Sequence, residues 1–366
     1  MAKVFLGDVV DHIKDKVNKD ETDLEFYVGG EHIEGREIVV RQKGLIQGST
    51  IGPAFHMRFQ KGDVLLMSRN PHLCKASMVD FDGICSDVSY VCRTKDNNIL
   101  LQSLLPFIMQ TDEFWQFAEE NKKGGLPFFL NWKDFARFEF ELIPIDQQRK
   151  ISDLLWAFER AKNAYKDLIK KTDDLVKSQF IEMFGDPVRN TKLLPVNLLS
   201  EVGENLDSRR IPITGGDRKA GKYPYYGASG IVDYVDDFIF DEDILLISED
   251  GANLLARVTP IAFPASGKVW VNNHAHVMRF DDMAMQVYIE HLLNMIDISS
   301  YVTGTAQPKL NQAKLNSIPV PVPNKSSLES FRAFVEQSDK SKFAAKQALD
   351  NLNASQKALM NQIFGE

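Results

Sequence analysis

The chain repeats itself at a constant interval of 180 residues. Three separated segments match at this interval (243 − 63, 310 − 130 and 364 − 184): Asp63–Ser68 with Asp243–Ser248, Leu130-Asn131 with Leu310-Asn311, and Lys177 with Phe184-Gly185-Asp186 against Lys357 with Phe364-Gly365-Glu366. A repeat of this kind constrains the fold more than any single motif. In a chain of 366 residues it predicts two copies of one unit.

The first copy ends in a predicted long helix over residues 146–187. Asp146 follows Pro144 and is a candidate N-cap, while Gly185 and Pro187 supply a stop. About 40 residues at about 1.5 Å each give a helix roughly 60 Å long. Its apolar positions alternate by three and four, which indicates this heptad seam: Ile151, Leu154, Phe158, Ala161, Tyr165, Leu168, Thr172, Leu175 and Gln179.

A second long helix is predicted over residues 325–366. It should begin near Ser326, where Ser326 and Glu329 have the spacing of a capping box. Its seam is Leu328, Phe331, Val335, Ser338, Ala345, Leu349, Leu352, Leu359 and Ile363. Each helix alone would expose an apolar stripe, so we expect the two to pack as an antiparallel coiled-coil pair.

Residues 1–145 and 188–324 form the two predicted globular parts. Short β-rich runs separated by turn residues are followed by helical patterns, which indicates an α+β unit. The predicted strands are Val64–Ser68, Ser77–Val79, Ser89–Arg93, Ile244–Ser248, Val258–Phe263, Val269–Val271 and Ala275–Arg279, and the predicted helices lie around Leu100–Met109 and Val287–Met295. The fold class is therefore α+β, with two domains in a pseudo-two-fold repeat separated by two long antiparallel helices.

Composition narrows the class of protein. Cys74, Cys85 and Cys92 form neither an even disulfide set nor a C-x-x-C zinc pattern. The sequence shows no signal peptide and no apolar run long enough to cross a bilayer, so we expect a cytoplasmic protein. The net charge of −8 excludes a uniformly basic DNA wrapper but permits a reader whose cations gather on one face.

Catalytic signatures are absent from the sequence. There is no glycine-rich methyl-donor or phosphate loop, no D/N-P-P-Y/F tetrapeptide and no metal-ligand motif. Asp241-Glu242-Asp243 is interpreted as a solvated turn before a strand rather than as a magnesium cluster. We expect a chain that is not an enzyme and that holds no metal or cofactor.

The second half resembles the specificity subunits of type I restriction–modification systems. Four segments in the family's order carry the resemblance: Tyr223–Gly230 with Ile231–Tyr234, Asp243–Ser248 with Asp250-Gly251, Asn272–Val277, and Thr303–Asn311. The first half is more distant, with Tyr27–Glu34 similar to a family segment near the start of a recognition domain.

The resemblance implies a division of labour among subunits. Each globular part would be a target recognition domain that reads one half of a split double-stranded DNA sequence. The helices would set the spacing and dock two modification (methyltransferase) subunits, and motor-nuclease restriction subunits would complete the assembly. S-adenosylmethionine, ATP and Mg would belong to those partners.

DNA reading needs cations for phosphates and polar side chains for base edges. The basic, glycine-rich segment Ser208–Tyr223 is the best candidate in the second half, and Arg41–Thr50 with Ser68–His72 has similar chemistry in the first. The predicted DNA-binding residues are Arg41, Lys43, Gln47, Ser49, Arg69, Asn70, His72, Arg209, Arg210, Thr214, Arg218, Lys219, Lys222, Asn253 and Lys309.

Four apolar residues lie off the predicted seam of the first helix: Leu155, Trp156, Ile169 and Val176. A bare helix pair would expose them, so either a partner or the recognition domains should cover them. We assign them to partner binding.

Two other functions fit parts of the pattern. One is the reader part of a fused, type II-like methyltransferase–nuclease, whose catalytic motifs should then be visible. The other is a non-enzymatic scaffold in which paired helices display two adaptor domains.

Overall fold

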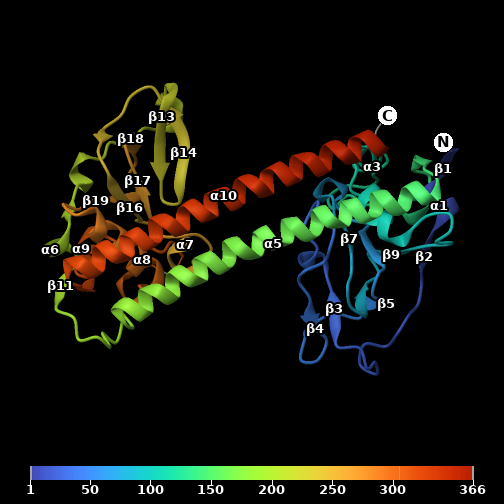
Figure 1. The fold of residues 1–366 in the computed structure, drawn as a ribbon, viewed down its shortest axis with the longest axis horizontal. Helices are drawn as coiled ribbons and strands as arrows, with labels where there is room; N and C mark the ends of the chain where they lie inside the picture. The colour runs from blue at the N-terminus through green and yellow to red at the C-terminus, as the bar shows by residue number, and fades with distance from the viewer. Residues whose placement is uncertain (1, 305, 365–366) are drawn as a thin grey trace. The chain divides into compact units, whose positions relative to one another are not determined.

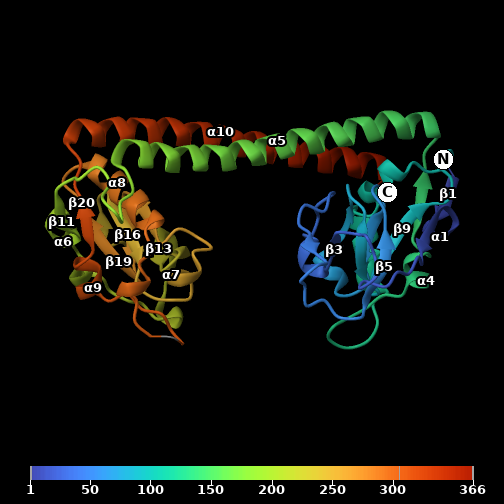
Figure 2. The same ribbon diagram turned by 90° about the horizontal axis from the view of Figure 1, so that it is seen from below.

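The computed structural model describes residues 2–304 and 306–364 (Figures 1 and 2). The chain forms two compact units, one of residues 2–166 with 347–364 and the other of residues 167–346. Thr305 of the Thr303–Asn311 segment, and Gly365 and Glu366 of the terminal repeat match, lie outside the described residues. Within the described residues no helix is long and apolar enough to cross a membrane.

The first unit contains one two-stranded and two four-stranded sheets. Their strand orders are β1-β10, β2-β9-β6-β7 and β4-β3-β8-β5. The strands are β1 (Ala2–Phe5), β2 (Val10–Ile13), β3 (Phe26–Val28), β4 (Gly44–Leu45), β5 (Phe55–Phe59), β6 (Val64–Met67), β7 (Ala76–Met78), β8 (Gly83–Ser86), β9 (Ser89–Thr94) and β10 (Glu139–Leu142). The short helices are α1 (Leu6–Val9), α2 (Leu105–Ile108), α3 (Asp112–Glu120) and α4 (Trp132–Phe135).

The second unit repeats this arrangement strand for strand. Its sheet orders are β11-β20, β12-β19-β16-β17 and β14-β13-β18-β15. The strands are β11 (Val196–Leu198), β12 (Glu204–Asn205), β13 (Ala220–Gly227), β14 (Gly230–Val235), β15 (Phe240–Asp241), β16 (Ile244–Ser248), β17 (Ala262–Ala265), β18 (Lys268–Val271), β19 (Ala275–Arg279) and β20 (Pro319–Pro321). The short helices are α6 (Leu199–Val202), α7 (Asn253–Ala256), α8 (Met283–Met295) and α9 (Gln312–Asn316).

Pairing directions also repeat, which establishes the duplication. The neighbours β3 and β8 are parallel, as are β13 and β18, while the flanking pairs β5–β8 and β15–β18 are antiparallel. The predicted repeat and the α+β class are confirmed. Two local predictions were wrong: Val258 precedes its strand, which begins at Ala262, and the predicted helix around Leu100–Met109 is only the short α2 after a 3₁₀ turn.

The repeat is not uniformly spaced. Val64 and Leu66 face the core on the helix side of the first unit, whereas the residues with that role in the second unit are Leu245 and Ile247. The spacing in this strand is therefore 181, not 180. A one-residue slip moves every side chain to the other face of a sheet, so the apparent match of Asp63–Ser68 to Asp243–Ser248 is out of register by one.

Each unit has two hydrophobic cores. A smaller core lies between the two four-stranded sheets, and includes Leu65 with Cys85 in the first unit and Leu246 with Val269 in the second. A larger core lies between one sheet and the long helices, α5 (Ile145–Phe184) and α10 (Lys325–Phe364). Each unit takes one part of both helices, which run antiparallel within it (Figure 1).

The helix ends differ slightly from the predicted ones. Asp146 lies in the first turn of α5 rather than at its N-cap. Asn324 caps α10 by accepting a hydrogen bond of 2.9 Å from the Ser327 N–H, so the predicted Ser326–Glu329 capping box was wrong. Gly185 ends α5 with φ +76°, as its lack of a side chain allows.

The predicted seam of α10 is buried from Leu328 to Ala345, but farther on the buried residues are Gln356 and Met360, which lie off that seam. The buried face of α5 is shifted by one residue from the predicted seam. Leu154 on the predicted seam is 47% exposed, whereas its neighbour Leu155 is fully buried. The buried residues of α5 are Gln148, Ser152, Leu155, Glu159, Lys162, Val176, Phe180 and Phe184. Several of these are polar, which explains why hydrophobicity alone selected the wrong stripe.

A lysine lies in the helix interface of each unit. In the first unit the Lys162 Nζ is 2.8 Å from Glu159 and 2.9 Å from the Gln356 Oε1, and Gln356 also donates to Glu159. In the second unit, Lys342 occupies the position 180 residues later and pairs with Asp339 at 2.8 Å and Asp173 at 2.9 Å. Polar partners thus replace apolar packing where the seam is weakest.

The shifted seam makes a testable prediction. Leu155→Ala should destabilise the first unit by about 2–5 kcal/mol because it opens a cavity in a closed core. Leu154→Ala, one residue away, should cost less than about 1 kcal/mol because that side chain is already half exposed. Chemical denaturation of both variants checks this, and equal losses would contradict the assigned buried face.

Candidate nucleic-acid interface

The basic segment Ser208–Tyr223 of the second unit begins as a loop and ends as a strand. A 3₁₀ turn covers Asp207–Arg209, a second one covers Gly215–Asp217, and β13 begins at Ala220. Its first part is therefore a loop, and its last four residues belong to β13. The buried Tyr225 hydroxyl accepts a hydrogen bond from the Ile213 N–H at 3.1 Å and so fastens the loop to the sheet.

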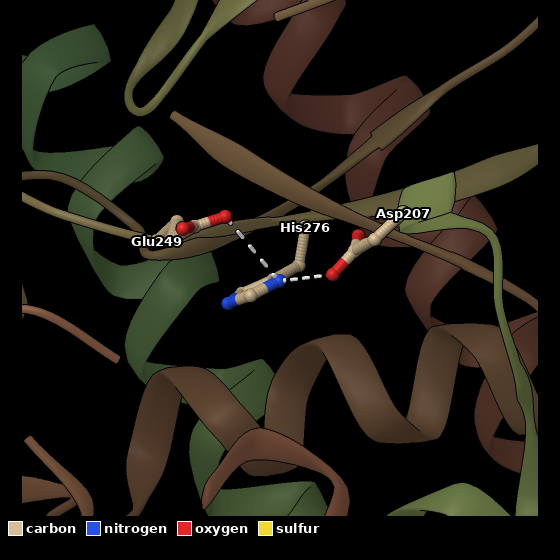
Figure 3. Close-up of side chains that lie close together, drawn as sticks. All are labelled: Asp207, Glu249 and His276. Atoms are coloured by element: carbon tan, nitrogen blue, oxygen red, sulfur yellow. Dashed lines mark hydrogen bonds and ion pairs between the residues drawn. The ribbon is translucent and has the colours of Figure 1, made fainter. Parts of the chain in front are cut away.

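A buried polar cluster anchors the start of this loop (Figure 3). The His276 Nδ1 lies 2.6 Å from the Asp207 Oδ2 and 3.7 Å from the Glu249 Oε2. The His276 Nε2 is 2.7 Å from the Leu310 carbonyl oxygen, so both ring nitrogens face acceptors. Four segments distant in the sequence thereby meet at one histidine.

Two cations complete the cluster. Arg210 lies 2.7 Å from Glu249 and 3.4 Å from Asp207, and it also donates to the Ala275 carbonyl. Lys309 pairs with the other oxygen of Glu249 at 3.1 Å. The two carboxylates are thus matched by Arg210, Lys309 and the histidine.

The cluster contains carboxylate and imidazole atoms within 4.8 Å of one another, the donor set of a metal site. Its surroundings do not fit a cation. The Asp207 Oδ1 accepts the Val277 N–H at 2.9 Å, both histidine nitrogens are used, and Arg210 already occupies the position beside the carboxylates. We interpret the cluster as an ion-pair network that holds the loop.

The ionisation of the two acids fits this interpretation. Burial alone would raise the pKa of Asp207, but the hydrogen bond and charge of His276, with the Val277 N–H and Arg210, hold that pKa below its ordinary value. Burial likewise opposes ionisation of Glu249, yet Arg210, His276 and Lys309 lower its pKa. Both side chains are therefore ionised and paired near neutral pH.

Most of the predicted DNA-binding residues of the second unit have intramolecular partners. Arg210 and Lys309 belong to the cluster. Arg209 pairs with Glu242 at 2.7 Å, and Arg218 pairs with Asp233 at 3.2 Å. The Thr214 hydroxyl donates to Asp217, and the Asn253 side chain bonds the Thr259 backbone at both of its polar atoms.

Lys219 and Lys222 are the predicted cations that stay available. Both are exposed, and neither has an ion pair within residues 2–304 and 306–364. The Lys222 Nζ lies 5.2 Å from the ring centre of Tyr223. These two lysines at the start of β13 are thus the strongest phosphate-contact candidates of the second unit.

In the first unit, the predicted segment Arg41–Thr50 divides between two environments. Arg41 faces the long helix, where it bonds Asn163 and lies 3.8 Å from Glu37. Lys43 stacks on Phe26, with its Nζ 3.4 Å from the ring centre. Gln47 is exposed, and the Ser49 hydroxyl donates to the Ile46 carbonyl at 2.8 Å.

The turn Ser68–His72 combines buried backbone anchors with two exposed side chains. Asn70 adopts φ +53°, and its N–H donates to the Phe128 carbonyl at 2.8 Å. The side chains of Arg69 and His72 are exposed. Arg69 lies beside a hollow of about 410 Å³ that Asp87, Tyr90 and Asn131 also line.

The four residues assigned to partner binding are covered by their own units. Leu155 and Val176 are buried in the two helix-side cores. The Trp156 Nε1 donates to the Ser103 carbonyl at 2.8 Å, and Ile169 is half-buried. The assignment to a partner was therefore wrong for Leu155, Trp156 and Val176, because the recognition domains already contact them. The exposed leucines of α5 are Leu154 in the first unit and Leu168 and Leu175 in the second.

Comparison with known proteins finds a family match in the second half of the chain. The family described as "Type I restriction modification DNA specificity domain" matches residues 196–363. The second unit therefore contains a domain of this family. The match covers the half of the chain in which the motifs were recognised, and it confirms the resemblance drawn from them.

A curated relative agrees with the family match. A Haemophilus influenzae protein named as a type I restriction enzyme specificity subunit is 35% identical over 125 residues, which are 34% of this chain and 32% of that protein. The matched region thus spans about a third of that relative's length. The matches give no support to a fused methyltransferase–nuclease or to an adaptor scaffold.

Solved structures extend the likeness to the whole chain. The type I restriction–modification S subunit from M. genitalium superposes with a TM-score of 0.64 and 15% identity, over 100% of this chain and 96% of that one. A chain from a study of complex assembly and conformational transition of the type I R-M system gives 0.55 and 17%, over 99% and 97%. These matches confirm the fold of two domains with long helices.

Sequence reasoning missed the buried cluster. It selected Asn272–Val277 as a family segment, but it did not single out His276 or its partners Asp207 and Glu249. A detectable signal existed, because His276 interrupts the apolar run of β19 on a strand that is buried on both faces. A polar residue at such a position requires a partner.

The cluster makes a prediction about stability. Arg210→Ala should cost about 3–5 kcal/mol because it leaves buried carboxylates without their cation. Arg209→Ala, the adjacent control, should cost no more than about 1 kcal/mol since its pair is partly exposed. Denaturation of the full chain near pH 7 measures both.

The pH dependence distinguishes the pairing from simple packing. Because the pKa values of Asp207 and Glu249 are lowered in the folded state, the stabilisation that they provide is present above their ordinary values of 3.8 and 4.5 and is lost as the pH falls below that range. The Arg210→Ala deficit should therefore narrow below about pH 4. A deficit independent of pH would indicate lost packing instead.

Proposed function

We propose that this chain is the DNA-reading subunit of a type I restriction–modification complex and that each unit reads one half of a bipartite target. The observation that carries the proposal is the strand-for-strand duplication, in which the fold of the family-matched second unit occurs again in the first unit. One chain with two different readers suits an asymmetric split site. The chain itself is proposed to be non-catalytic and to act in the cytoplasm.

The proposed reading surface of each unit is built from its exposed, unpaired polar side chains. Lys219 and Lys222 would contact phosphates in the second unit. Gln47, Arg69 and His72 would lie at the DNA in the first. Arg210, Lys309 and Asn253 would act indirectly, since their contacts fix the loops that carry the reading groups.

The long helices are proposed to set the spacing and to dock two modification subunits. Both α5 and α10 have 40 residues, about 60 Å at 1.5 Å per residue. The docking residues we now favour are the exposed leucines of α5, among them Leu168 and Leu175. Restriction subunits would join that assembly. The partners would contribute S-adenosylmethionine, ATP and Mg, together with the methyl transfer and cleavage.

The spacing role is tested by shortening both helices. Deletion of one heptad from α5 and the matching heptad from α10 removes about 10 Å of helix. The full chain, co-expressed with its modification subunits, should then methylate sites with a shorter unread spacer and the same two half-sites. Methylome sequencing measures both features. Altered half-sites with an unaltered spacer would refute the role.

The docking role is tested on the second unit. Leu168→Glu with Leu175→Glu should abolish stable assembly with the modification subunits. Docking would bury the two new carboxylates in an apolar interface without partners, which is unfavourable. Size-exclusion chromatography with light scattering measures the assembly. Leu193→Glu is the control, since Leu193 is 87% exposed but lies outside the helices. Normal assembly of the double variant would place the partners elsewhere.

A further inference from the structure

A tight turn in the first unit carries an exposed apolar tip. The Lys123 N–H donates to the Phe129 carbonyl at 2.9 Å, and the Phe129 N–H donates back to the Lys123 carbonyl at 3.1 Å. Leu126, between these ends, is 84% exposed. Figure 2 shows the segment leading into α4 on the side of this unit that faces away from the long helices.

The turn is held firmly at its base. The Leu130 N–H donates to the Ser68 carbonyl at 2.8 Å, and Lys123 pairs with Asp134 at 2.7 Å. Gly124 has φ +83°, and a Cβ there would lie 2.9 Å from the Phe129 ring, so only glycine fits. The exposure of Leu126 is thus imposed by an ordered turn and is not the result of a frayed loop.

The second unit has a turn closed by the same pair of backbone hydrogen bonds but with a different sequence. Thr303 and Lys309 exchange reciprocal backbone hydrogen bonds of 2.8 and 2.7 Å, and the Leu310 N–H donates to the Glu249 carbonyl at 2.8 Å. Both intervening segments begin with a glycine and differ at the four positions after it, Gly-Gly-Leu-Pro-Phe in the first unit against Gly-Thr-Ala-Gln-Pro in the second. Two domains that read different DNA sequences need the same backbone hydrogen bonds to hold the turn, with different side chains on it.

The surroundings of the turn fit base edges. Arg69, whose backbone bridges to Phe129, is exposed and has no ion pair within residues 2–304 and 306–364. Asp87 and Asn131 line the adjoining hollow. Guanidinium donors, carboxylate acceptors and amides recognise base edges in the major groove, and an apolar side chain contacts the thymine methyl group. A surface for phosphates alone would be cationic throughout.

We propose that the Lys123–Phe129 turn is a base-contacting element of the first recognition domain, with Leu126 as a specificity-determining residue that contacts a thymine methyl group. The inference rests on the proposed DNA-reading function. It adds a second reading turn beside Ser68–His72, to which the Asn70–Phe128 hydrogen bond joins it.

The test compares Leu126→Ala with wild type in the full chain assembled with its modification subunits. The probe is a double-stranded DNA library of random sequence, and bound molecules are sequenced. Leu126→Ala should lose its preference at one or two adjacent positions in one half-site, with about tenfold weaker binding to the wild-type motif. The other half-site should be unchanged. Leu193→Ala, an equally exposed leucine elsewhere, should leave both halves intact.

Each contrary result has a distinct meaning. An unchanged motif and affinity for Leu126→Ala would overturn the inference while leaving the DNA-reading function in place. Loss of assembly with the modification subunits would overturn it in favour of a protein contact. Failure of the wild-type complex to select any motif would instead refute the proposed function. Thermal unfolding of the variant should match wild type, since Leu126 is outside the core.

Discussion

Burial of one face of α5 and α10 is the interaction on which the rest of the structure depends. Neither helix has a continuous apolar seam, because Gln148, Glu159, Lys162 and Gln356 lie at buried positions. The helices are stable only when these polar groups find partners and when a recognition domain covers the adjacent apolar residues. The C-terminal part of α10 therefore belongs to the first unit, where Met360 packs with Leu155. In each unit the recognition domain and its parts of the two helices share one hydrophobic core and stabilise each other.

The duplication preserves backbone anchors and changes side-chain chemistry. The Tyr90 hydroxyl donates to the Leu130 carbonyl at 3.1 Å in the first unit, and His276 makes the matching contact to Leu310 in the second. In the first unit this position belongs to an aromatic group with Trp132, whereas in the second it is the centre of an ion-pair network. Loops with the same backbone hydrogen bonds are thus held by aromatic packing in one unit and by ion pairs in the other. Their exposed residues can differ because they take no part in these contacts.

Several residues predicted to contact DNA make intramolecular ion pairs, and the reason is electrostatic. Sequence shows where arginines and lysines gather, but an arginine near buried carboxylates is drawn to them rather than to a phosphate. Arg210 lies between Asp207 and Glu249, whose lowered pKa values keep both charged. Lys219, a few residues later, has no such neighbour and stays exposed. The difference depends in part on Glu249, which is 39 positions from Arg210 (249 − 210) and therefore outside any local pattern.

The sequence by itself determined the duplication, the two long helices, most central strands and the family resemblance of the second half, because these depend on spacing, periodicity and local motifs. Only the tertiary structure decided the register of the seam and strands and the partners of the charged side chains. The seam of α5 moved by one residue from Leu154 to Leu155, and the β6–β16 match moved from 180 to 181. In both places neighbouring positions are similarly apolar, so the face that is buried follows from which other segments pack there. The buried face is the one that gives the whole unit its lowest free energy, and the local sequence does not indicate which face that is.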